Sequence, residues 1–156
     1  MSDTKIGREI EKKFICRIIG DPPDASTGMR IEQVYLSVGD PQVRIRCVDG
    51  QYVQTVKDRA TNLEVEFTLG DDVGRALFDI APTQPILKTR FVEGPWEIDV
   101  FAGRFDGLVF LEIEDPPATL PPMPAWLECV EETGVGNIDM ATMTAAAIAA
   151  LVARSR

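Results

Sequence analysis

The segments Leu87-Lys-Thr-Arg-Phe91 and Trp96-Glu-Ile-Asp-Val100 alternate strictly between uncharged and charged side chains. Side chains at positions i and i+2 of a β-strand point to the same face of the sheet. Each segment therefore predicts a strand with one mainly apolar face and one charged face. The charged face is basic in the first strand and acidic in the second.

Segments of the same kind recur along the chain on both sides of this pair. Charges at i and i+2 are found again in Glu9–Lys13, Val43–Cys47, Leu63–Phe67 and Leu111–Glu114, and in weaker form in Tyr52–Lys57. Because an antiparallel sheet commonly has one apolar and one polar face, the pattern predicts a mainly β protein with antiparallel strands.

Within most of these strands the charged face carries a single sign. The like-charged pairs are Arg44/Arg46, Lys88/Arg90, Glu64/Glu66, Glu97/Asp99 and Glu112/Glu114. Like charges roughly 7 Å apart on one face repel, which costs stability unless opposite charges lie between them. An open sheet with a solvated charged face explains the alternation but not this pairing. We therefore expect a closed barrel whose charged faces line a tunnel and whose apolar faces point outward.

Helices and loops are expected to cover the apolar outer faces. Residues Asp71–Ile80 have the spacing of an amphipathic helix, with Asp71 as its expected N-cap. Residues Asp139–Ala153 predict a C-terminal helix. The stretches 20–28 and 115–124 are rich in turn-forming residues, which indicates surface loops.

The composition limits the class of protein. A chain of 156 residues fits a single domain, and a net charge of −9 argues against binding to nucleic acid or to anionic membranes. The N-terminal segment has no signal-peptide core, and the longest apolar run is too short to span a bilayer. The three widely spaced cysteines indicate free thiols in a reducing compartment. We therefore expect a cytoplasmic protein, either a monomer or a homodimer.

The chain contains no histidine. This excludes Ser-His-Asp catalysis, Cys-His catalysis and histidine-ligated zinc. Any metal ion must be held mainly by oxygen, which favours Mg²⁺, Mn²⁺ or Ca²⁺. A tunnel lined with both signs of charge suits a polyphosphate that chelates divalent metal, because arginine and lysine match phosphate oxygens while carboxylates hold the metal.

An ordered series of short motifs runs through residues 7–137. The series comprises Glu9-Ile-Glu-Lys-Lys13, Arg30–Leu36, Arg44-Ile-Arg46, Lys57, Glu64-Val-Glu66, Lys88–Phe91, Trp96–Asp99, Glu112-Ile-Glu114 and Pro124–Leu127. In type and order these motifs resemble the ExExK, RIEQGYL, RxR, strand-lysine, ExE, KTRY, WEVD, final ExE and PPWLG motifs of the CYTH superfamily. This superfamily is also called the triphosphate tunnel metalloenzymes.

The resemblance implies an eight-stranded antiparallel closed tunnel barrel with a C-terminal helix at about 139–153. It implies a small-molecule triphosphate as substrate and Mg²⁺ or Mn²⁺ as cofactor. The metal ligands it indicates best are Glu9, Glu11 and Glu114, and weaker candidates are Glu64, Glu66, Glu97, Asp99 and Glu112. The residues expected to contact phosphate are Lys13, Arg44, Arg46, Lys57, Lys88 and Arg90.

Short chains of this layout are most similar to family members that hydrolyse inorganic tripolyphosphate to pyrophosphate and phosphate. The alternatives are a class IV-type adenylyl cyclase, a thiamine or nucleoside triphosphatase, and a polyphosphate- or nucleotide-binding module with little turnover. Two departures keep the last one open: Asn62 stands where the family usually has an arginine, and Gly134–Asn137 replaces a basic and aromatic stretch. For proton removal the sequence leaves two alternatives, a metal-bound water or Lys88 with Tyr35 beside it.

Overall fold

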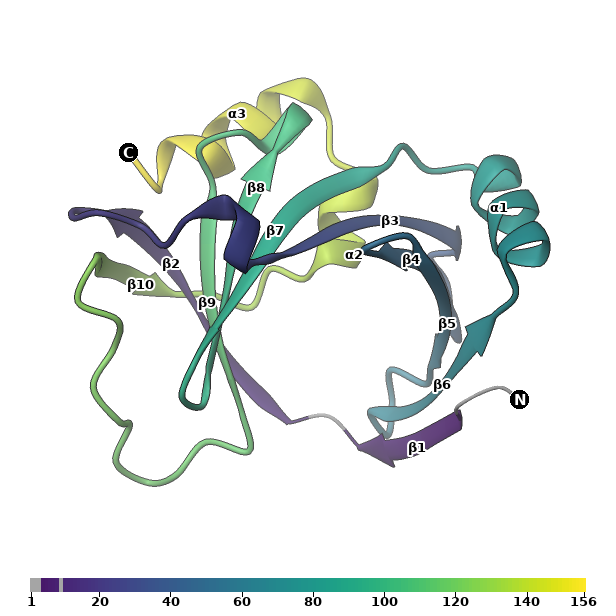
Figure 1. Ribbon diagram of the computed structural model, residues 1–156, viewed down its shortest axis with the longest axis horizontal. Helices are drawn as coiled ribbons and strands as arrows, with labels where there is room; N and C mark the ends of the chain where they lie inside the picture. Colours follow the sequence, from purple (N-terminus) through teal and green to yellow (C-terminus); the bar gives the residue numbers. More distant parts are fainter. Residues whose placement is uncertain (1–3, 9) are drawn as a thin grey trace.

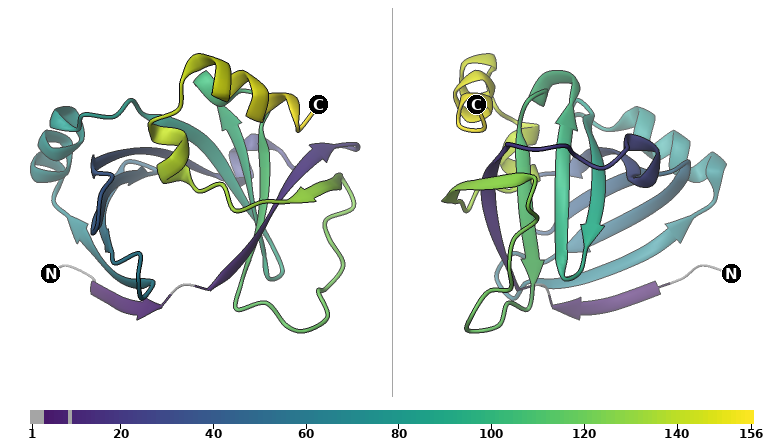
Figure 2. Two further views of the ribbon diagram at one scale, coloured as in Figure 1. Left: turned by 180° about the vertical axis from the view of Figure 1, so that it is seen from behind. Right: turned by 60° about the vertical axis from the view of Figure 1, so that its left-hand side comes forward.

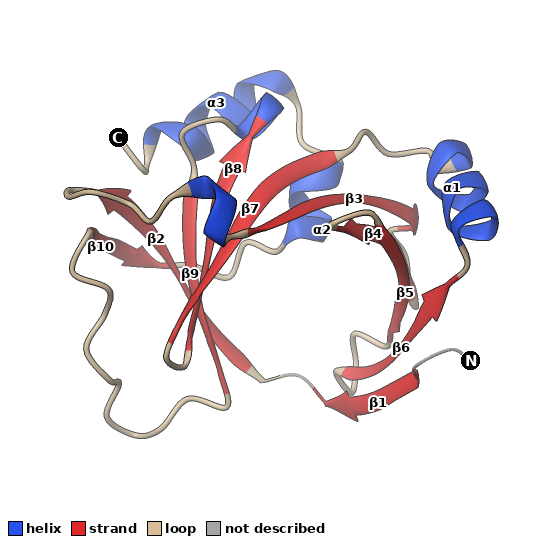
Figure 3. Cartoon of the chain, viewed as in Figure 1, coloured by secondary structure: helices blue, strands red, loops and turns tan. Residues whose placement is uncertain are grey.

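The computed structural model describes residues 4–8 and 10–156. Within them, antiparallel strands form a single ten-stranded sheet. The strands are β1 (Thr4–Arg8), β2 (Glu11–Ile18), β3 (Met29–Ser37), β4 (Gln42–Val48), β5 (Gln51–Lys57), β6 (Leu63–Leu69), β7 (Ile86–Glu93), β8 (Trp96–Ala102), β9 (Val109–Glu114) and β10 (Leu127–Glu132). The helices are α1 (Asp71–Ile80), α2 (Asn137–Ala141) and α3 (Ala145–Ala153), with 3-10 turns at Ala25–Thr27 and Gly103–Phe105 (Figure 3).

The sheet bends into a ring, with strand order β1-β6-β5-β4-β3-β7-β8-β9-β2-β10 (Figure 1). The predicted alternating segments fall in strands, apart from the start of the first one: Glu9 lies outside the described residues, and Ile10 precedes β2. The prediction of a mainly antiparallel β fold is therefore confirmed. Most strands turn one face toward the inside of the ring, and in strands such as β4, β6 and β9 that face carries the charged residues.

The prediction of eight strands closed into a barrel is wrong in two respects. The described sheet has ten strands, and hydrogen bonds between them do not close it. The reason lies in the pairing of β2, whose two edges are occupied by β9 and β10, so that β1 pairs only with β6. The ring is instead joined by the chain itself, because β1 ends at Arg8 and β2 begins at Glu11.

The apolar outer faces of the strands are covered by α1 and by the proline-rich loop 115–124. Tyr52 of β5 packs edge to face against Phe78 of α1. On the other half of the sheet, the indole of Trp96 donates a hydrogen bond to the carbonyl of Pro122 at 2.9 Å. These contacts bury apolar surface outside the ring, which leaves the inner face available for polar side chains.

The C-terminal segment departs from the single helix predicted over residues 139–153. It forms α2 and α3, because the Thr144 side chain accepts a hydrogen bond from the Ala147 backbone at 3.2 Å and caps a new helix. Both helices pack against the inner side of the sheet, where Met140 and Leu151 join Phe101 and Phe110 in one apolar cluster (Figure 2). The C-terminal helices therefore fill one end of the ring rather than covering its outside.

Helix α1 spans the predicted residues, but Gly70 rather than Asp71 is its N-cap, and no side chain caps it. Asp71 and Asp72 lie in the first turn, where negative charge favours the helix dipole. No helix within residues 4–8 and 10–156 is long and apolar enough to cross a membrane.

Candidate active site

Charged side chains on the inner faces of the strands line a cavity of about 540 Å³. Its lining includes Lys5 and Arg8 of β1, Glu11 and Lys13 of β2, Tyr35 of β3, Arg44 and Arg46 of β4, Thr55 and Lys57 of β5, Glu64 and Glu66 of β6, Arg90 of β7, Glu97 of β8, Glu112 and Glu114 of β9, and Asn137 of α2. Nearly every strand thus contributes a polar group to one space, which the alternation of the sequence requires once the sheet bends.

The basic wall of the cavity is formed around Arg44 and Arg46 of β4. The Arg46 Nε donates to the Gln33 side-chain oxygen at 3.0 Å, and Arg44 donates to the Thr55 hydroxyl at 3.1 Å. Thr55 in turn donates to Glu66 at 3.0 Å. Arg46 is therefore oriented by a neutral amide, whereas Arg44 is oriented by a neutral hydroxyl and also lies 4.0 Å from the Glu66 carboxylate. Both guanidinium groups are held at the cavity, where they can meet an anion.

The positive charges of this wall act on one another. Burial, together with the nearby Arg44 and Arg90, lowers the pKa of the Arg46 guanidinium to about 9. An anion in the cavity would relieve this repulsion, and a guanidinium fork matches a pair of phosphate oxygens.

The acidic wall lies across the cavity on β2, β8 and β9. Strand register places Glu11 directly opposite Glu114, and Glu97 directly opposite Glu112. Like charges at directly opposed positions repel, so this wall favours a cation. Burial, and also Glu112 and Glu114, raise the pKa of Glu97 despite the opposing effect of Arg90.

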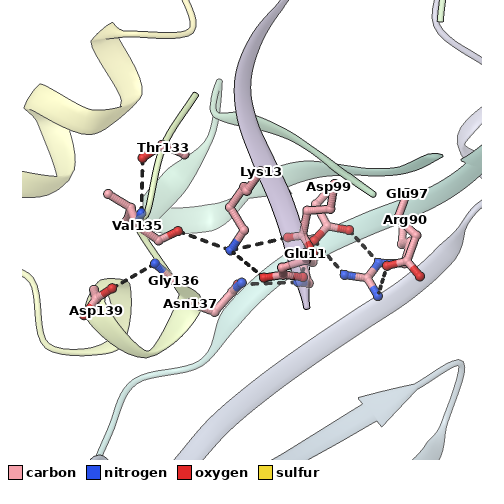
Figure 4. A network of polar contacts seen from close by, with 12 residues as sticks. Glu11, Lys13, Arg90, Glu97, Asp99, Thr133, Val135, Gly136, Asn137 and Asp139 are labelled. Atoms are coloured by element: carbon pink, nitrogen blue, oxygen red, sulfur yellow. Dashed lines mark hydrogen bonds and ion pairs between the residues drawn. The ribbon is translucent and has the colours of Figure 1, made fainter. Parts of the chain in front are cut away.

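Lys13 places an ammonium group next to the carboxylates of this wall (Figure 4). Its ammonium lies 3.5 Å from Glu112 and 3.8 Å from Glu11, and it donates to the carbonyl of Val135 at 3.2 Å. Burial by itself would lower the pKa of Lys13, but Glu112 and Glu11 outweigh that effect and raise it. Lys13 therefore links the carboxylates to the segment that leads into α2.

Beneath the cavity, Asp99 holds two cations in a buried network. Arg90 donates to both Asp99 oxygens at 2.7 and 2.9 Å, and Lys88 donates to the second of them at 2.7 Å. Arg90 also lies 2.8 Å from Glu97. The pKa of Asp99 is well below its usual range, because Lys88 and Arg90 outweigh the effect of burial.

Lys88 lies deeper than the sequence indicated. Its side chain is fully buried, and its ammonium is linked to the cavity lining through Asn137, whose oxygen accepts a hydrogen bond at 3.4 Å, and through Asp99, which also binds Arg90. Burial lowers the pKa of Lys88 to about 7; Asp99 opposes this shift, while Arg46 and Arg90 reinforce it.

The structure brings most of the predicted site residues together. Those that line the cavity are Glu11, Lys13, Tyr35, Arg44, Arg46, Lys57, Glu64, Glu66, Arg90, Glu97, Glu112 and Glu114. Lys88 and Asp99 are buried beside it, with exposed fractions of 2% and 1%. Glu9, predicted as a metal ligand, lies outside the described residues.

Several polar residues at this site were missed from the sequence. Gln33 and Thr55 are buried and hold the two arginines of β4, and Asn137 contacts Lys88. Gln33 and Thr55 lie opposite Arg46 and Arg44 in the strand register. Thr55 is in phase with Lys57, so strand parity indicates its place, whereas Gln33 is out of phase with the charged residues Arg30 and Glu32 of its own strand and no local pattern indicates it. Lys5 and Arg8 belong to a strand that the sequence did not predict.

A second cavity of about 750 Å³ adjoins the first and shares Glu11, Lys13 and Lys57 with it. Arg59 and Asn62 lie in its lining. The place where the family usually has an arginine therefore faces this adjoining space, and Arg59 brings a cation to it.

The acidic wall fits a hard divalent cation that is shared with a ligand. Within residues 4–8 and 10–156, no group of three or more Asp, Glu or Cys side chains is placed so that it could hold a metal ion. Mg²⁺ is usually held by one or two carboxylates together with waters and substrate phosphate oxygens. Paired carboxylates facing a cationic wall match that arrangement.

The fold and the cavity define a class of protein in which a curved antiparallel sheet surrounds a space with one cationic and one anionic wall. The comparisons with known proteins identify the family. The chain is 32% identical to the inorganic triphosphatase of Acetivibrio thermocellus over 121 residues, which are 71% of this chain and 76% of that protein. The chain therefore belongs to the inorganic triphosphatase family.

Solved structures show the same fold. A structure described as the hypothetical protein NE1496 matches with a TM-score of 0.60 and 25% identity, over 86% of this chain and 98% of that one. A structure described as the inorganic triphosphatase NE1496 matches with a TM-score of 0.61 and 24% identity, over 88% and 97%. No family model matches the chain.

Proposed function

We propose that this protein hydrolyses inorganic tripolyphosphate to pyrophosphate and phosphate, with Mg²⁺ or Mn²⁺ as cofactor. The observation that carries the proposal is the cavity itself, in which Arg44 and Arg46 face the carboxylates of β2, β8 and β9 across one space. The name of the Acetivibrio thermocellus relative supports hydrolysis of an inorganic triphosphate.

The cations of the cavity would bind the phosphate groups. Arg44, Arg46 and Arg90 present guanidinium groups from neighbouring parts of the ring, and Lys57 adds an ammonium at the side shared with the second cavity. Contacts to several of its oxygens would fix the tripolyphosphate with one terminal phosphorus oriented for attack by water. Such positioning is the main contribution that a protein makes to phosphoryl transfer.

The carboxylates of the acidic wall would hold the metal. We assign Glu11, Glu112 and Glu114 to this role, with Glu97 beside them; Glu9 stays a candidate from the sequence. A divalent cation here would supply Lewis-acid stabilisation of the phosphate oxygens. We assign no metal ligation to Asp99, because Arg90 and Lys88 already bind both of its oxygens.

We propose a positioning role for Lys88. Its hydrogen bonds hold Asp99, which in turn fixes Arg90 at the cavity wall. Tyr35 is the one of the two predicted catalytic residues that lines the cavity, and its hydroxyl can contact substrate. Tyr35 is also the only aromatic residue among the described lining residues of the two cavities. The described lining therefore offers few aromatic side chains on which a nucleobase or a thiamine ring could stack, which favours an inorganic substrate.

The test compares tripolyphosphate, ATP and thiamine triphosphate with Mg²⁺, with Mn²⁺ and with chelator, and identifies the products. We expect metal-dependent release of phosphate and pyrophosphate from tripolyphosphate. Replacing Glu11→Gln or Glu114→Gln should lower kcat/KM by about 100-fold or more while the protein stays folded.

Glu128→Gln is the matched control, because Glu128 lies on exposed β10 and pairs with Arg17 at 3.3 Å. It should leave the rate unchanged. Full activity with chelator, or full activity in both site variants, would refute metal-dependent hydrolysis. Cyclic AMP from ATP would indicate a cyclase, and tight binding without products would indicate a binding module.

A further inference from the structure

Two of the three cysteines lie face to face on the outer side of the sheet. Cys16 of β2 is directly opposite Cys129 of β10 in the strand register. Because directly opposed residues of neighbouring strands project to the same face of the sheet, the two side chains lie next to each other on that face. Cys16 belongs to the apolar cluster that contains Trp126 and Leu127, so it lies on the other face of β2 from Glu11 and Lys13.

The type of strand pair favours a bond between them. Ile19 donates its backbone N–H to the Trp126 carbonyl at 2.9 Å, just before the register of β2 and β10 begins. Hydrogen-bonded and non-hydrogen-bonded pairs alternate along an antiparallel ladder, which makes Cys16 and Cys129 a non-hydrogen-bonded pair. The Cα atoms of such pairs are about 4.5 Å apart and their side chains are close. This separation falls within the range that a disulfide spans.

We propose that Cys16 and Cys129 form an oxidisable dithiol site, which peroxide converts to an intramolecular disulfide. This inference is independent of the proposed function. The Cys129 thiolate attacks one peroxide oxygen, the O–O bond breaks, and a sulfenic acid and water result. Sulfur of Cys16 then attacks the sulfenic sulfur, and a second water leaves. The two thiols lose two electrons in total, and hydrogen peroxide is reduced to two waters.

The exposure of the two thiols sets the order of these events. Cys129 is exposed, whereas Cys16 is fully buried. Burial, reinforced by the neighbouring Cys129, raises the pKa of Cys16 to about 12, and burial also raises the pKa of Cys129. Because the thiolate is the reactive form, Cys129 meets the oxidant first, and the reaction should accelerate as the pH rises from 7 to 9.

The disulfide would fasten the outermost strand to the strand that carries part of the active site. Beyond Cys129 the register shifts before Glu131, so β10 has an irregularity next to the proposed bond. The chain then continues to Thr133, which donates to the Lys13 carbonyl at 2.9 Å, and to Val135, which accepts from the Lys13 ammonium. Oxidation would thus restrain the segment between β10 and Val135, which contacts Lys13 of the cavity.

The experiment treats the full-length, reduced protein with hydrogen peroxide at pH 7 and pH 9, alkylates free thiols and maps peptides without reduction. We expect one linked peptide pair containing Cys16 and Cys129, a mass loss of about 2 Da, and one remaining titratable thiol. The melting temperature should rise by several degrees and return after reduction, because the bond closes a long loop.

Cys47→Ser is the control, since Cys47 lies on β4 and belongs to another cluster. It should form the same linked pair, with no thiol left. Cys129→Ser should abolish the linkage, and because Cys129 is exposed this variant is expected to fold; Cys16→Ala provides a second check. Linkage to Cys47, a disulfide only between two chains, or three free thiols after peroxide treatment would each overturn the proposal.

Discussion

At the scale of single residues, the cations in and beside the cavity are held by two kinds of partner. Gln33 orients Arg46 through a neutral amide, and Thr55 orients Arg44 through a hydroxyl, with the Glu66 carboxylate farther from Arg44 at 4.0 Å. Lys88, by contrast, is bound to Asp99 at 2.7 Å and shares that carboxylate with Arg90. The first arrangement prepares a site for an anion, and the second stabilises the wall that carries it.

This difference gives a prediction for Lys88→Met. If Lys88 only positions Asp99 and Arg90, the variant should raise KM, while the pH–rate profile keeps the shape of the wild type. If Lys88 removes a proton during the reaction, only its neutral form works. With its pKa lowered to about 7, the wild-type rate would then rise as the pH passes through 7.

The measurement is kcat and KM from pH 5.5 to 10 for both proteins. We expect the profiles to coincide after scaling. A rising limb near pH 7 that is present in the wild type and absent from Lys88→Met would reject the positioning role. Gln33→Met is a useful comparison, because it also removes a buried polar partner of a cavity cation.

At the scale of elements, α1 gives a prediction that runs against helix propensity. Alanine is normally favoured over glycine within a helix by about 1 kcal/mol. At Gly74, however, a Cβ would lie 2.3 Å from Tyr52 Cβ, so α1 would have to move away from β5. We expect Gly74→Ala to lower the free energy of unfolding by about 1–3 kcal/mol, as overpacking usually does.

The control is Gly70→Ser at the N-cap of the same helix. A side chain at Gly70 meets nothing within 4 Å, and serine can cap the first turn. Urea unfolding should therefore show a change of no more than a few tenths of a kcal/mol for Gly70→Ser. Equal stability of Gly74→Ala and the wild type would show that α1 can shift without cost.

Periodicity explains which elements the sequence predicts and which it does not. Segments such as Leu63–Phe67 alternate cleanly and lie within strands of the observed sheet. β10 was missed because the register shift between Cys129 and Glu131 breaks the alternation. The break between α2 and α3 was missed because Thr144 lies inside an otherwise continuous apolar, alanine-rich pattern, and its capping role depends on local backbone geometry.

The same reasoning applies to the candidate site. The face on which a charged residue lies follows from strand parity, so the sequence already indicates that residues such as Arg44 and Glu112 project toward one shared space. How deeply a side chain is buried does not follow from whether its position in the strand is odd or even. Lys88 and Asp99 are buried because Phe101, Phe110 and the C-terminal helices pack inside the same end of the ring, a long-range contact that no local pattern contains.

At the scale of the whole molecule, the first strand completes the ring without closing it by hydrogen bonds. β1 pairs with β6, and Lys5 and Arg8 contribute positive charge to the cavity lining. Its side chains are exposed, so they contribute little to the apolar core. We therefore expect β1 to matter more for substrate than for stability.

The double variant Lys5→Gln, Arg8→Gln tests this expectation. It should raise KM for tripolyphosphate about tenfold at low ionic strength and less at high ionic strength, because salt screens exposed charges. The melting temperature should stay within about a degree of the wild type. Arg75→Gln on α1 is the matched control, since Arg75 is exposed and pairs with Asp79 rather than facing the cavity. An unchanged KM in the double variant would show that β1 does not contact substrate.

The sheet buries apolar side chains on its outer face under α1 and the proline-rich loop, while much of the inner face stays polar. Neighbouring positions of one strand are therefore under different selective constraints, one set by the ligand and the other by packing of the core. Along β4, substitutions at Arg44 and Arg46 would alter ligand preference, whereas substitutions at the intervening Ile45, which is fully buried, would alter foldability. Descendants of such a chain can diverge in chemistry by changing every second residue, with the scaffold inherited through the residues in between.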